Sequence, residues 1–365
     1  MDINSVIKTT FALKIILLLF GEYVYAPSIG LADTHGYLAQ ELAFPGINII
    51  YSSSEFTRFF GAIIGFLPKP IYHLPTLIIT LAAYDYFLKS IRTQLSLKNF
   101  KKVLLFSFIA INFPTVGMWS TVYSKESIFF AASFFLFGAI VKFGCEKKLP
   151  ILEILLTLYV FILFKPQYIL CLSLVLLYFT SVRLRLDRRI ICILIAFLSF
   201  TYLACVVIYD NDINDLSYNI HSHFDTSGAK STRQNIFTEE GDYLKHFFVG
   251  SFVAVAGATF SEAMVNNKLI PVAIEGHLFI VTVFYFFCKS LFLGQKLKVL
   301  DITLIISSII IILAVFYPLG YFNPGSGVRY RASIIPLLVF LYATIYIKNI
   351  DKKIFSQHKL SNPDS

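Results

Sequence analysis

The sequence contains little charge. Only 15% of its 365 residues are Asp, Glu, Lys or Arg, whereas about 25% is usual for a soluble globular domain, and 57% are hydrophobic. This shortage of charge excludes a water-soluble fold. It predicts an all-α polytopic integral membrane protein.

Cysteine patterns are also lacking. The five cysteines occur singly, with no CxxC spacing, so they indicate neither a disulfide framework nor a metal site. Lone cysteines in membrane segments are usually small apolar packing residues. The polar runs DND (210–212) and HSH (221–223) are not specific for a metal. We therefore expect no metal and no other cofactor.

Apolar stretches recur along the chain, each near the roughly 20 residues that a helix needs to cross about 30 Å of hydrocarbon. The first, FALKIILLLFGEYVYA, has no convincing cleavage site and is expected to be a retained helix. About ten spans are predicted, near residues 10–26, 70–90, 103–120, 127–143, 150–164, 167–182, 190–208, 270–290, 299–318 and 332–348.

The stretch at 246–262, HFFVGSFVAVAGATFSE, could be an eleventh span but is rich in Gly, Ala and Ser. Basic residues collect in cytoplasmic loops, and a crossing here would move the basic segments around Lys296 and Lys352 to the outer side. We therefore expect an interfacial or re-entrant helix at the outer leaflet. Both termini, including the tail 349–365, are then cytoplasmic.

The net charge of +9 is explained by basic cytoplasmic loops that face anionic lipid, so no nucleic-acid partner is expected. All cytoplasmic loops are short, which excludes a nucleotide-binding domain on that side. Two outer loops are long, at 27–69 and 209–246. We therefore expect a single membrane domain, residues 1–365, whose chemistry takes place at the outer face.

The first outer loop contains LADTHGYLAQELA, in which Asp33 follows the first span and His35 comes two residues later. A carboxylate near the membrane surface with apolar surroundings can have a raised pKa and act as a general base. The alternative is that Asp33 or Thr34 caps the helix that follows.

Two outer turns contain lysines. In WSTVYSKESIFF, Lys125 and Glu126 begin a span, and a helix N-terminus beside a lysine is suited to a phosphate. In FKPQY, Lys165 is nearly the only charge of a tight turn. For both lysines the alternative is an interfacial side chain whose ammonium group reaches water.

The second outer loop contains His221, His223, Asp225 and Arg233 among many acidic residues. Arg233 is a candidate for binding an anionic substrate, with a salt bridge inside the loop as the alternative. We do not expect the histidines and acids to form a metal site.

The stretch YFNPGSGVRYRASIIPLL places Arg329 and Arg331 between a Pro/Gly turn and the last span. Arginine binds phosphate with two parallel hydrogen bonds, and charge at membrane depth is costly unless it faces a cavity or a ligand. Residues two apart on a helix lie roughly 200° apart around its axis, so both can face one ligand only if the turn is irregular. We expect an irregular turn, with Arg329 as the better phosphate ligand.

Together, five features of the sequence resemble membrane glycosyltransferases of the GT-C type. They are DTHGY, SKESIFF, FKPQY, the outer juxtamembrane segment and GVRYRASIIPLL. They also resemble the related Wzy-type polymerases of bacterial O-antigen and other surface polysaccharides. The resemblance extends over most of the chain, but none of its motifs is a strict signature. A large outer loop with arginine and histidine, as in 209–246, is typical of the polymerases.

The resemblance implies that Asp33 is the catalytic base and that Lys125, Arg329 and Arg331 bind the phosphate of a polyprenyl-linked donor. We include His35, Glu126, Lys165 and Arg233 as further candidate substrate-binding residues. The acidic metal motif of oligosaccharyltransferases has no clear counterpart, which favours a metal-independent reaction. A large soluble domain after the last span, found in many GT-C members, is also missing.

The expected function is glycosyl transfer at the outer face of a bacterial inner membrane from a polyprenyl-phosphate or -diphosphate saccharide, in particular polymerisation of O-antigen or capsule repeat units. Expected partners are this lipid-linked saccharide, membrane lipid and other membrane proteins of polysaccharide assembly. The alternatives are a single-sugar GT-C transferase, a transporter or flippase of lipid-linked saccharide, and a membrane O-acyltransferase.

Overall fold

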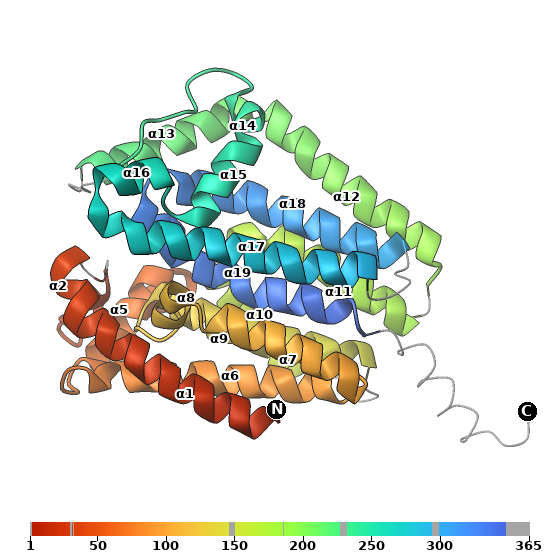
Figure 1. Cartoon of the computed structure of the whole chain (residues 1–365), viewed down its shortest axis with the longest axis horizontal. Helices are drawn as coiled ribbons and strands as arrows, with labels where there is room; N and C mark the ends of the chain where they lie inside the picture. The colour runs from red at the N-terminus through yellow and green to blue at the C-terminus, as the bar shows by residue number, and fades with distance from the viewer. Residues whose placement is uncertain are drawn as a thin grey trace, which may run out of the picture. The chain divides into compact units, whose positions relative to one another are not determined.

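The computed structural model describes residues 2–29, 31, 33–145, 150–184, 186–226, 232–293 and 299–347, and the tail expected at 349–365 lies outside them. The described residues form helices and no strand. They belong to two compact units (Figure 1). Unit 1 comprises 1–169, 182–184 and 335–365, and unit 2 comprises 170–181 and 185–334. A single membrane domain can contain more than one compact unit.

Unit 1 contains the first half of the described helices. They are α1 (Ile3–Phe20), the π-helix η1 (Gly21–Tyr25), α2 (Ala26–Ile29), α3 (Thr34–Leu38), α4 (Asn48–Tyr51), α5 (Ser53–Ile64), η2 (Ile71–His73), α6 (Leu74–Arg92), α7 (Leu97–Ile111), α8 (Pro114–Trp119), α9 (Lys125–Cys145), α10 (Ile151–Phe164) and η3 (Pro166–Tyr168).

Unit 2 contains most of α11 (Ile169–Leu184) and the first half of α19 (Pro324–Thr344), whose remaining residues belong to unit 1. Its other helices are α12 (Arg188–Ile208), α13 (Asp210–Thr226), α14 (Asp242–Lys245), α15 (Phe247–Ala256), α16 (Phe260–Val265), η4 (Asn267–Leu269), α17 (Ile270–Leu293) and α18 (Val299–Tyr321).

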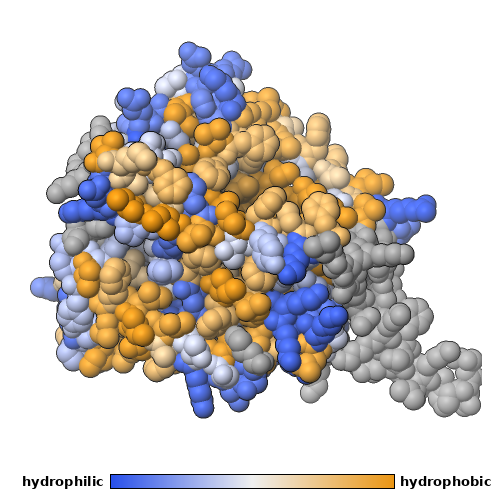
Figure 2. All heavy atoms as spheres, viewed as in Figure 1, coloured by the Kyte–Doolittle hydropathy of each residue, from blue (hydrophilic) through white to orange (hydrophobic). Residues whose placement is uncertain are grey.

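Five of the described helical segments are long and apolar enough to cross a membrane: Ile3–Tyr25, Lys125–Gly144, Arg189–Ile208, Asn267–Phe292 and Val299–Tyr321. A sixth is counted if Ile151–Phe164 and Pro166–Ser181, which are bent by 117°, form one span. Hydrophobic atoms cover broad areas of the face in view in Figure 2, as expected of helices that meet lipid. The chain therefore has the properties of a multi-pass membrane protein. The larger number, about ten spans, stays a prediction.

The span expected at 103–120 is two helices, α7 and α8, separated at Asn112 and Phe113. Phe113 has an extended backbone (ψ 135°), the conformation imposed on a residue before proline, and Pro114 begins α8. The Asn112 amide donates to the Phe108 carbonyl, 2.8 Å away, at the end of α7. The Asn-Phe-Pro sequence is thus a helix boundary.

The core of unit 1 is formed by α6 and α9. Phe134 of α9 packs between the rings of Tyr84 and Phe87 of α6, with ring centroids 5.4 and 5.2 Å away. The Tyr84 hydroxyl, although buried, is within 2.7 Å of the Ser107 hydroxyl of α7. This core packs the middle of α9, the helix that begins at Lys125 and Glu126.

The second outer loop expected at 209–246 contains a regular helix, α13, over its first half. In Figure 1, α12 and α13 run in clearly different directions from their junction at Tyr209. Ile213 and Ile220, two helical turns apart, pack against a buried aromatic cluster that is defined by Phe237, Tyr243, Tyr317 and Phe322. Although this stretch is mostly polar, Ile213 and Ile220 form a narrow apolar stripe on one side of α13, and this stripe is enough to pack the helix against the cluster.

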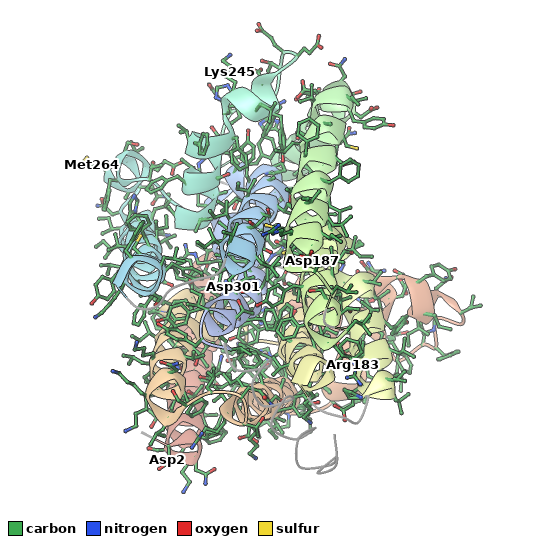
Figure 3. All side chains as sticks on the ribbon, turned by 90° about the vertical axis from the view of Figure 1, so that its right-hand side faces the viewer. Asp2, Arg183, Asp187, Lys245, Met264 and Asp301 are labelled. Carbon is green, nitrogen blue, oxygen red and sulfur yellow. The ribbon has the colours of Figure 1, made fainter. Side chains whose placement is uncertain are left out.

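The stretch at 246–262 forms two short helices, α15 and α16. They meet at Gly257, whose φ of +78° favours glycine. Thr259 and Glu262 then form a capping box that begins α16. The ten residues of α15 cover about 15 Å, half of a hydrocarbon core, so this helix alone does not cross. Met264 of α16 is exposed, at the margin of the view in Figure 3.

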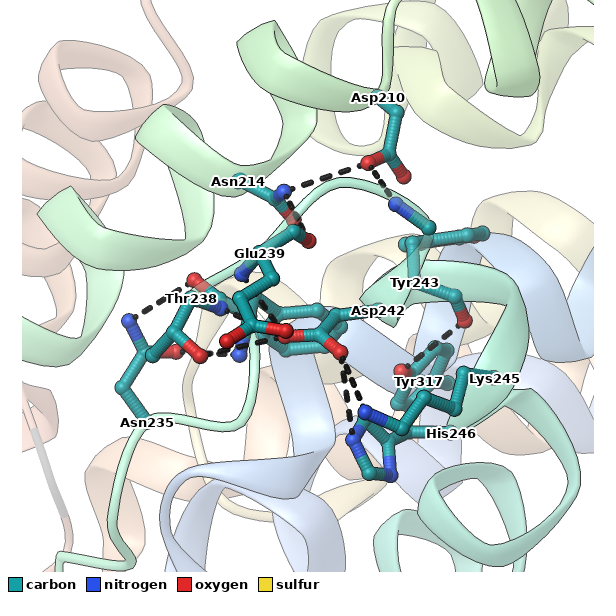
Figure 4. A network of polar contacts seen from close by, with 12 residues as sticks. Asp210, Asn214, Asn235, Thr238, Glu239, Asp242, Tyr243, Lys245, His246 and Tyr317 are labelled. Carbon is teal, nitrogen blue, oxygen red and sulfur yellow. Dashed lines mark hydrogen bonds and ion pairs between the residues drawn. The ribbon is translucent and has the colours of Figure 1, made fainter.

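The loop between α13 and α15 is organised around the buried carboxylate of Asp242 (Figure 4). Its Oδ2 accepts hydrogen bonds from the Glu239 N–H (2.8 Å) and from the N–H and hydroxyl of Thr238 (3.0 and 3.2 Å). Its Oδ1 lies 3.1 Å from the Lys245 ammonium. These donors, led by the Glu239 N–H, hold the pKa of Asp242 well below its usual range.

Because the folded pKa of Asp242 is depressed, its charge stabilises the fold at neutral pH, and this contribution is lost as the pH falls below about 4. We expect Asp242→Asn to lower the melting temperature of the purified protein by several degrees at pH 7, and the difference from wild type to shrink toward pH 3. Asp215→Asn, at an exposed site, is the control. A difference that stays constant between pH 7 and pH 3 contradicts this account.

Gly61 of α5 and Gly65, the residue that follows this helix, allow α3 to pack directly on the backbone. A Cβ on Gly61 would lie 2.6 Å from the Tyr37 carbonyl oxygen, and one on Gly65 would lie 2.1 Å from that of Leu38. Tyr123, which precedes α9, donates to the Thr57 carbonyl of α5 at 2.6 Å. The Gly-x-x-x-Gly spacing places both glycines on one face of α5 and so determines where α3 lies.

We expect Gly65→Ala to separate α3 from α5, because the added methyl group meets backbone that cannot move aside. Gly36→Ala on α3 is the matched control, since a Cβ there meets nothing within 4 Å. Thermal unfolding in detergent should show a loss of about 1–3 kcal/mol for Gly65→Ala and none for Gly36→Ala. Equal stability of the two variants contradicts the close contact.

Candidate functional site

The candidate site in unit 1 is built around Glu22, in the π-helix that ends the first candidate span. The Glu22 side chain is completely buried. Its Oε1 lies 3.1 Å from His35 Nε2, 2.8 Å from Lys69 Nζ and 2.7 Å from the Tyr72 hydroxyl, and its Oε2 lies 3.2 Å from His73 Nε2. Four side chains from two segments of the chain, α3 and residues 69–73, thus converge on one carboxylate.

The hydrogen bonds around His73 determine which of its nitrogens is protonated. Nδ1 accepts the backbone N–H of Tyr123 at 3.0 Å, so the proton is on Nε2, which donates to Glu22. His73 is therefore neutral, and Lys69 is the cation that balances Glu22. The arrangement connects the first span to η2 and to the segment before α9.

Sequence reasoning did not identify Glu22, Lys69, Tyr72 or His73. One signal was present: a glutamate in the apolar stretch LLLFGEYVYA is costly at membrane depth unless it has partners. The partners themselves could not be predicted, because they are 13 to 51 residues away along the chain.

Asp33 occupies the N-cap position of α3, as the alternative interpretation predicted, but its side chain makes no capping hydrogen bond. The residue is exposed, and its carbonyl accepts the Tyr37 N–H at 2.9 Å. His35, two residues later on the same short helix, is 49% exposed. The exposed carboxylate thus lies close in sequence to the imidazole that contacts Glu22.

The two predicted lysine turns also belong to unit 1. Lys125 Nζ lies 2.6 Å from the Ser54 hydroxyl of α5 and 5.9 Å from the centroid of the Tyr37 ring of α3. Glu126 pairs with Lys165 at 3.7 Å, with both side chains largely buried. Five predicted residues are thus connected. Asp33 and His35 both belong to the α3 region, and Lys125 contacts Tyr37 of the same helix. Glu126 follows Lys125 in the chain and pairs with Lys165.

Arg233 lies in unit 2, in an ion pair with Glu262. Its Nε and Nη2 lie 2.6 and 2.8 Å from the two carboxylate oxygens, and Nη2 also donates to the Gly257 carbonyl at 2.7 Å. Nη1 donates to the Tyr321 carbonyl. The guanidinium group thus holds the junction between α15 and α16. His221 lies 5.5 Å from the Phe322 ring, whereas the side chains of His223 and Asp225 lie outside the described residues.

The irregular turn expected before Arg329 is not present. Helix α19 begins at Pro324, where the Asn323 side chain accepts the N–H groups of Gly325 (2.8 Å) and Ser326 (3.3 Å). Asparagine followed by proline is a favourable helix start, and it extends the helix through the glycines. Arg329 and Arg331 therefore lie on different sides of α19.

The two arginines have different surroundings. Arg331 is completely buried, and its Nε and Nη2 donate to the carbonyls of Val255 (2.9 Å) and Ala256 (2.8 Å) at the end of α15. Its Nη1 lies 3.4 Å from Glu275. Arg329 is only partly buried and donates to the Tyr330 hydroxyl at 3.0 Å. Arg331 thus stabilises the C-terminus of α15.

Within the described part of the chain, no group of three or more His, Cys, Asp or Glu side chains could hold a metal ion. No family model, curated protein or solved structure matches this chain. The function is therefore inferred from the residues and their geometry.

We expect Glu22→Gln to destabilise unit 1. The single amide oxygen cannot accept all four hydrogen bonds, and the loss of the carboxylate leaves the Lys69 ammonium without its counter-charge. Loss of such buried partners costs about 1–3 kcal/mol, which is several degrees in melting temperature. Glu41→Gln, at an exposed site between α3 and α4, is the control. If both variants melt at the same temperature, Glu22 does not organise the site.

Proposed function

We propose that the protein transfers a glycosyl group at the outer face of a bacterial inner membrane, from a polyprenyl-phosphate or -diphosphate saccharide. The observation that carries this proposal is the convergence of the first outer loop on the end of the first span. Around Glu22, an exposed carboxylate, a half-exposed imidazole and the Lys69 ammonium lie on neighbouring segments.

The physical requirements of the reaction support this assignment. A polyprenyl donor has its chain in lipid and its phosphate at the surface, so transfer needs a carboxylate, a proton acceptor and cations at that depth. Asp33 is the proposed catalytic carboxylate, and His35 and Lys125 are proposed to bind the donor and acceptor near it. Glu126 and Lys165, a largely buried ion pair, are proposed to support this region.

Arg329 remains the proposed arginine for the lipid phosphate in unit 2. The contacts of Arg331 with Val255 and Ala256, and those of Arg233 with Glu262, favour supporting roles for these two arginines. In the proposed topology about ten spans cross the membrane, both termini are cytoplasmic, and 246–262 lies at the outer leaflet.

Within this reaction class we favour a polymerase of O-antigen or capsule repeat units, with a single-sugar transferase as the alternative. The long polar segments of the outer loops favour a polymerase, because its acceptor is itself a glycan that must be held at the surface. Other membrane proteins of polysaccharide assembly are the proposed partners.

We expect Asp33→Asn, and independently Arg329→Ala, to abolish or shorten the surface glycan in a host that lacks its own copy of the gene, as measured by gel electrophoresis. The matched controls are Asp215→Asn and Arg58→Ala, both at exposed positions. Loss of long chains with retention of a single repeat indicates a polymerase. Normal chain length and amount in well-expressed Asp33→Asn and Arg329→Ala variants contradicts glycosyl transfer.

One observation favours a transporter as the second candidate function. Lys14 lies inside the first candidate span and is buried, with its ammonium donating to the hydroxyls of Ser120 and Thr121 and to the Gly117 carbonyl. Buried charges and bent helices within the membrane are typical of transporters. The alternative is structural: the same contacts let the Lys14 ammonium cap the C-terminal end of α8, which by itself accounts for its burial.

A further inference from the structure

The two ring nitrogens of His35 have different surroundings. Nε2 lies 3.1 Å from the buried Oε1 of Glu22, while half of the side chain is exposed. Among the described residues, Nδ1 has no hydrogen-bond partner. When Nε2 donates to Glu22, the lone pair of Nδ1 lies on the other edge of the ring and is available to a bound molecule.

Glu22 is held in place from several directions. Lys69 and Tyr72 contact the same oxygen as His35, and the neutral His73 donates to the other oxygen. These three residues and His35 are the titratable groups that face Glu22. With Glu22 and Lys69 both ionised the cluster is neutral, so a proton taken up by His35 produces an imidazolium directly beside a carboxylate.

This geometry is that of a carboxylate–histidine pair, in which a buried acid orients an imidazole and stabilises its protonated form. The position of the ring is further determined by α3, which packs on the Gly61 and Gly65 backbone of α5. The carboxylate lies in a π-helical segment, a distortion that is frequent at functional sites.

We propose that His35, oriented by Glu22, is the general base that accepts the proton of the acceptor hydroxyl. This proposal rests on the proposed glycosyl transfer and assigns the proton transfer to His35. Asp33 then provides negative charge for the positive charge that develops on the sugar ring. Glu22 is a positioning residue, because it acts through His35.

In the proposed step, the acceptor oxygen forms a bond to the anomeric carbon of the donor sugar while its proton moves to His35 Nδ1. The bond between the anomeric carbon and the phosphate oxygen breaks, and its electron pair leaves with the polyprenyl phosphate or diphosphate. The imidazolium subsequently releases its proton to water.

The first test is His35→Gln, which preserves an N–H donor for Glu22 but cannot accept a proton. General-base catalysis typically contributes 10²- to 10⁴-fold, so we expect glycan synthesis to fall by about 100-fold or more while the melting temperature of the purified protein is unchanged. If His35→Gln makes glycan at the wild-type rate, His35 is not the base.

The second test is His35→Ala with imidazole in the medium, since the half-exposed position leaves room for the added base. We expect synthesis to be partly restored, and restoration to rise with the basicity of substituted imidazoles. Asp33→Asn with imidazole is the control and should not be restored. Absence of restoration in a folded His35→Ala variant overturns the assignment.

These outcomes are distinguishable from failure of the proposed function. If Asp33→Asn stops synthesis while His35→Gln does not, glycosyl transfer stands and the assignment of His35 fails. If neither variant alters the glycan, both proposals fail.

Discussion

The buried carboxylate of Glu22 is the interaction on which unit 1 depends. A charge at the end of an apolar helix is costly, and four donors from α3, Lys69 and η2 offset that cost. The same contacts position His35 at the surface. One electrostatic requirement thus both organises the segment between α1 and α6 and orients the His35 ring.

The helical membrane class could be predicted from composition, because 57% hydrophobic residues in long stretches leave no other fold. Five of the predicted spans coincide with helices long and apolar enough to cross. Local signals also explain the breaks: Pro114 interrupts one expected span, and Gly257 separates α15 from α16. Asn323 followed by Pro324 is a sequence pattern typical of a helix start, and it could have predicted that α19 begins there.

The site was less predictable, because its contacts are long-range. Asp33, His35 and Lys125 were identified by their positions at helix ends, but nothing local connects Glu22 to Lys69 or His73. The positive charge of an arginine did not reveal its role. Arg331 donates to backbone carbonyls at the end of α15, and Arg233 binds the Gly257 carbonyl and the Glu262 carboxylate. Roles of this kind depend on which segments pack together.

The most direct measurement uses the purified protein in lipid vesicles that contain a polyprenyl-diphosphate saccharide extracted from the host. Glycosyl transfer predicts that free polyprenyl diphosphate is released while a longer glycan is formed, and that His35→Gln and Asp33→Asn suppress the release. Movement of intact lipid-linked saccharide across the vesicle membrane, with no release of polyprenyl diphosphate, would contradict this account.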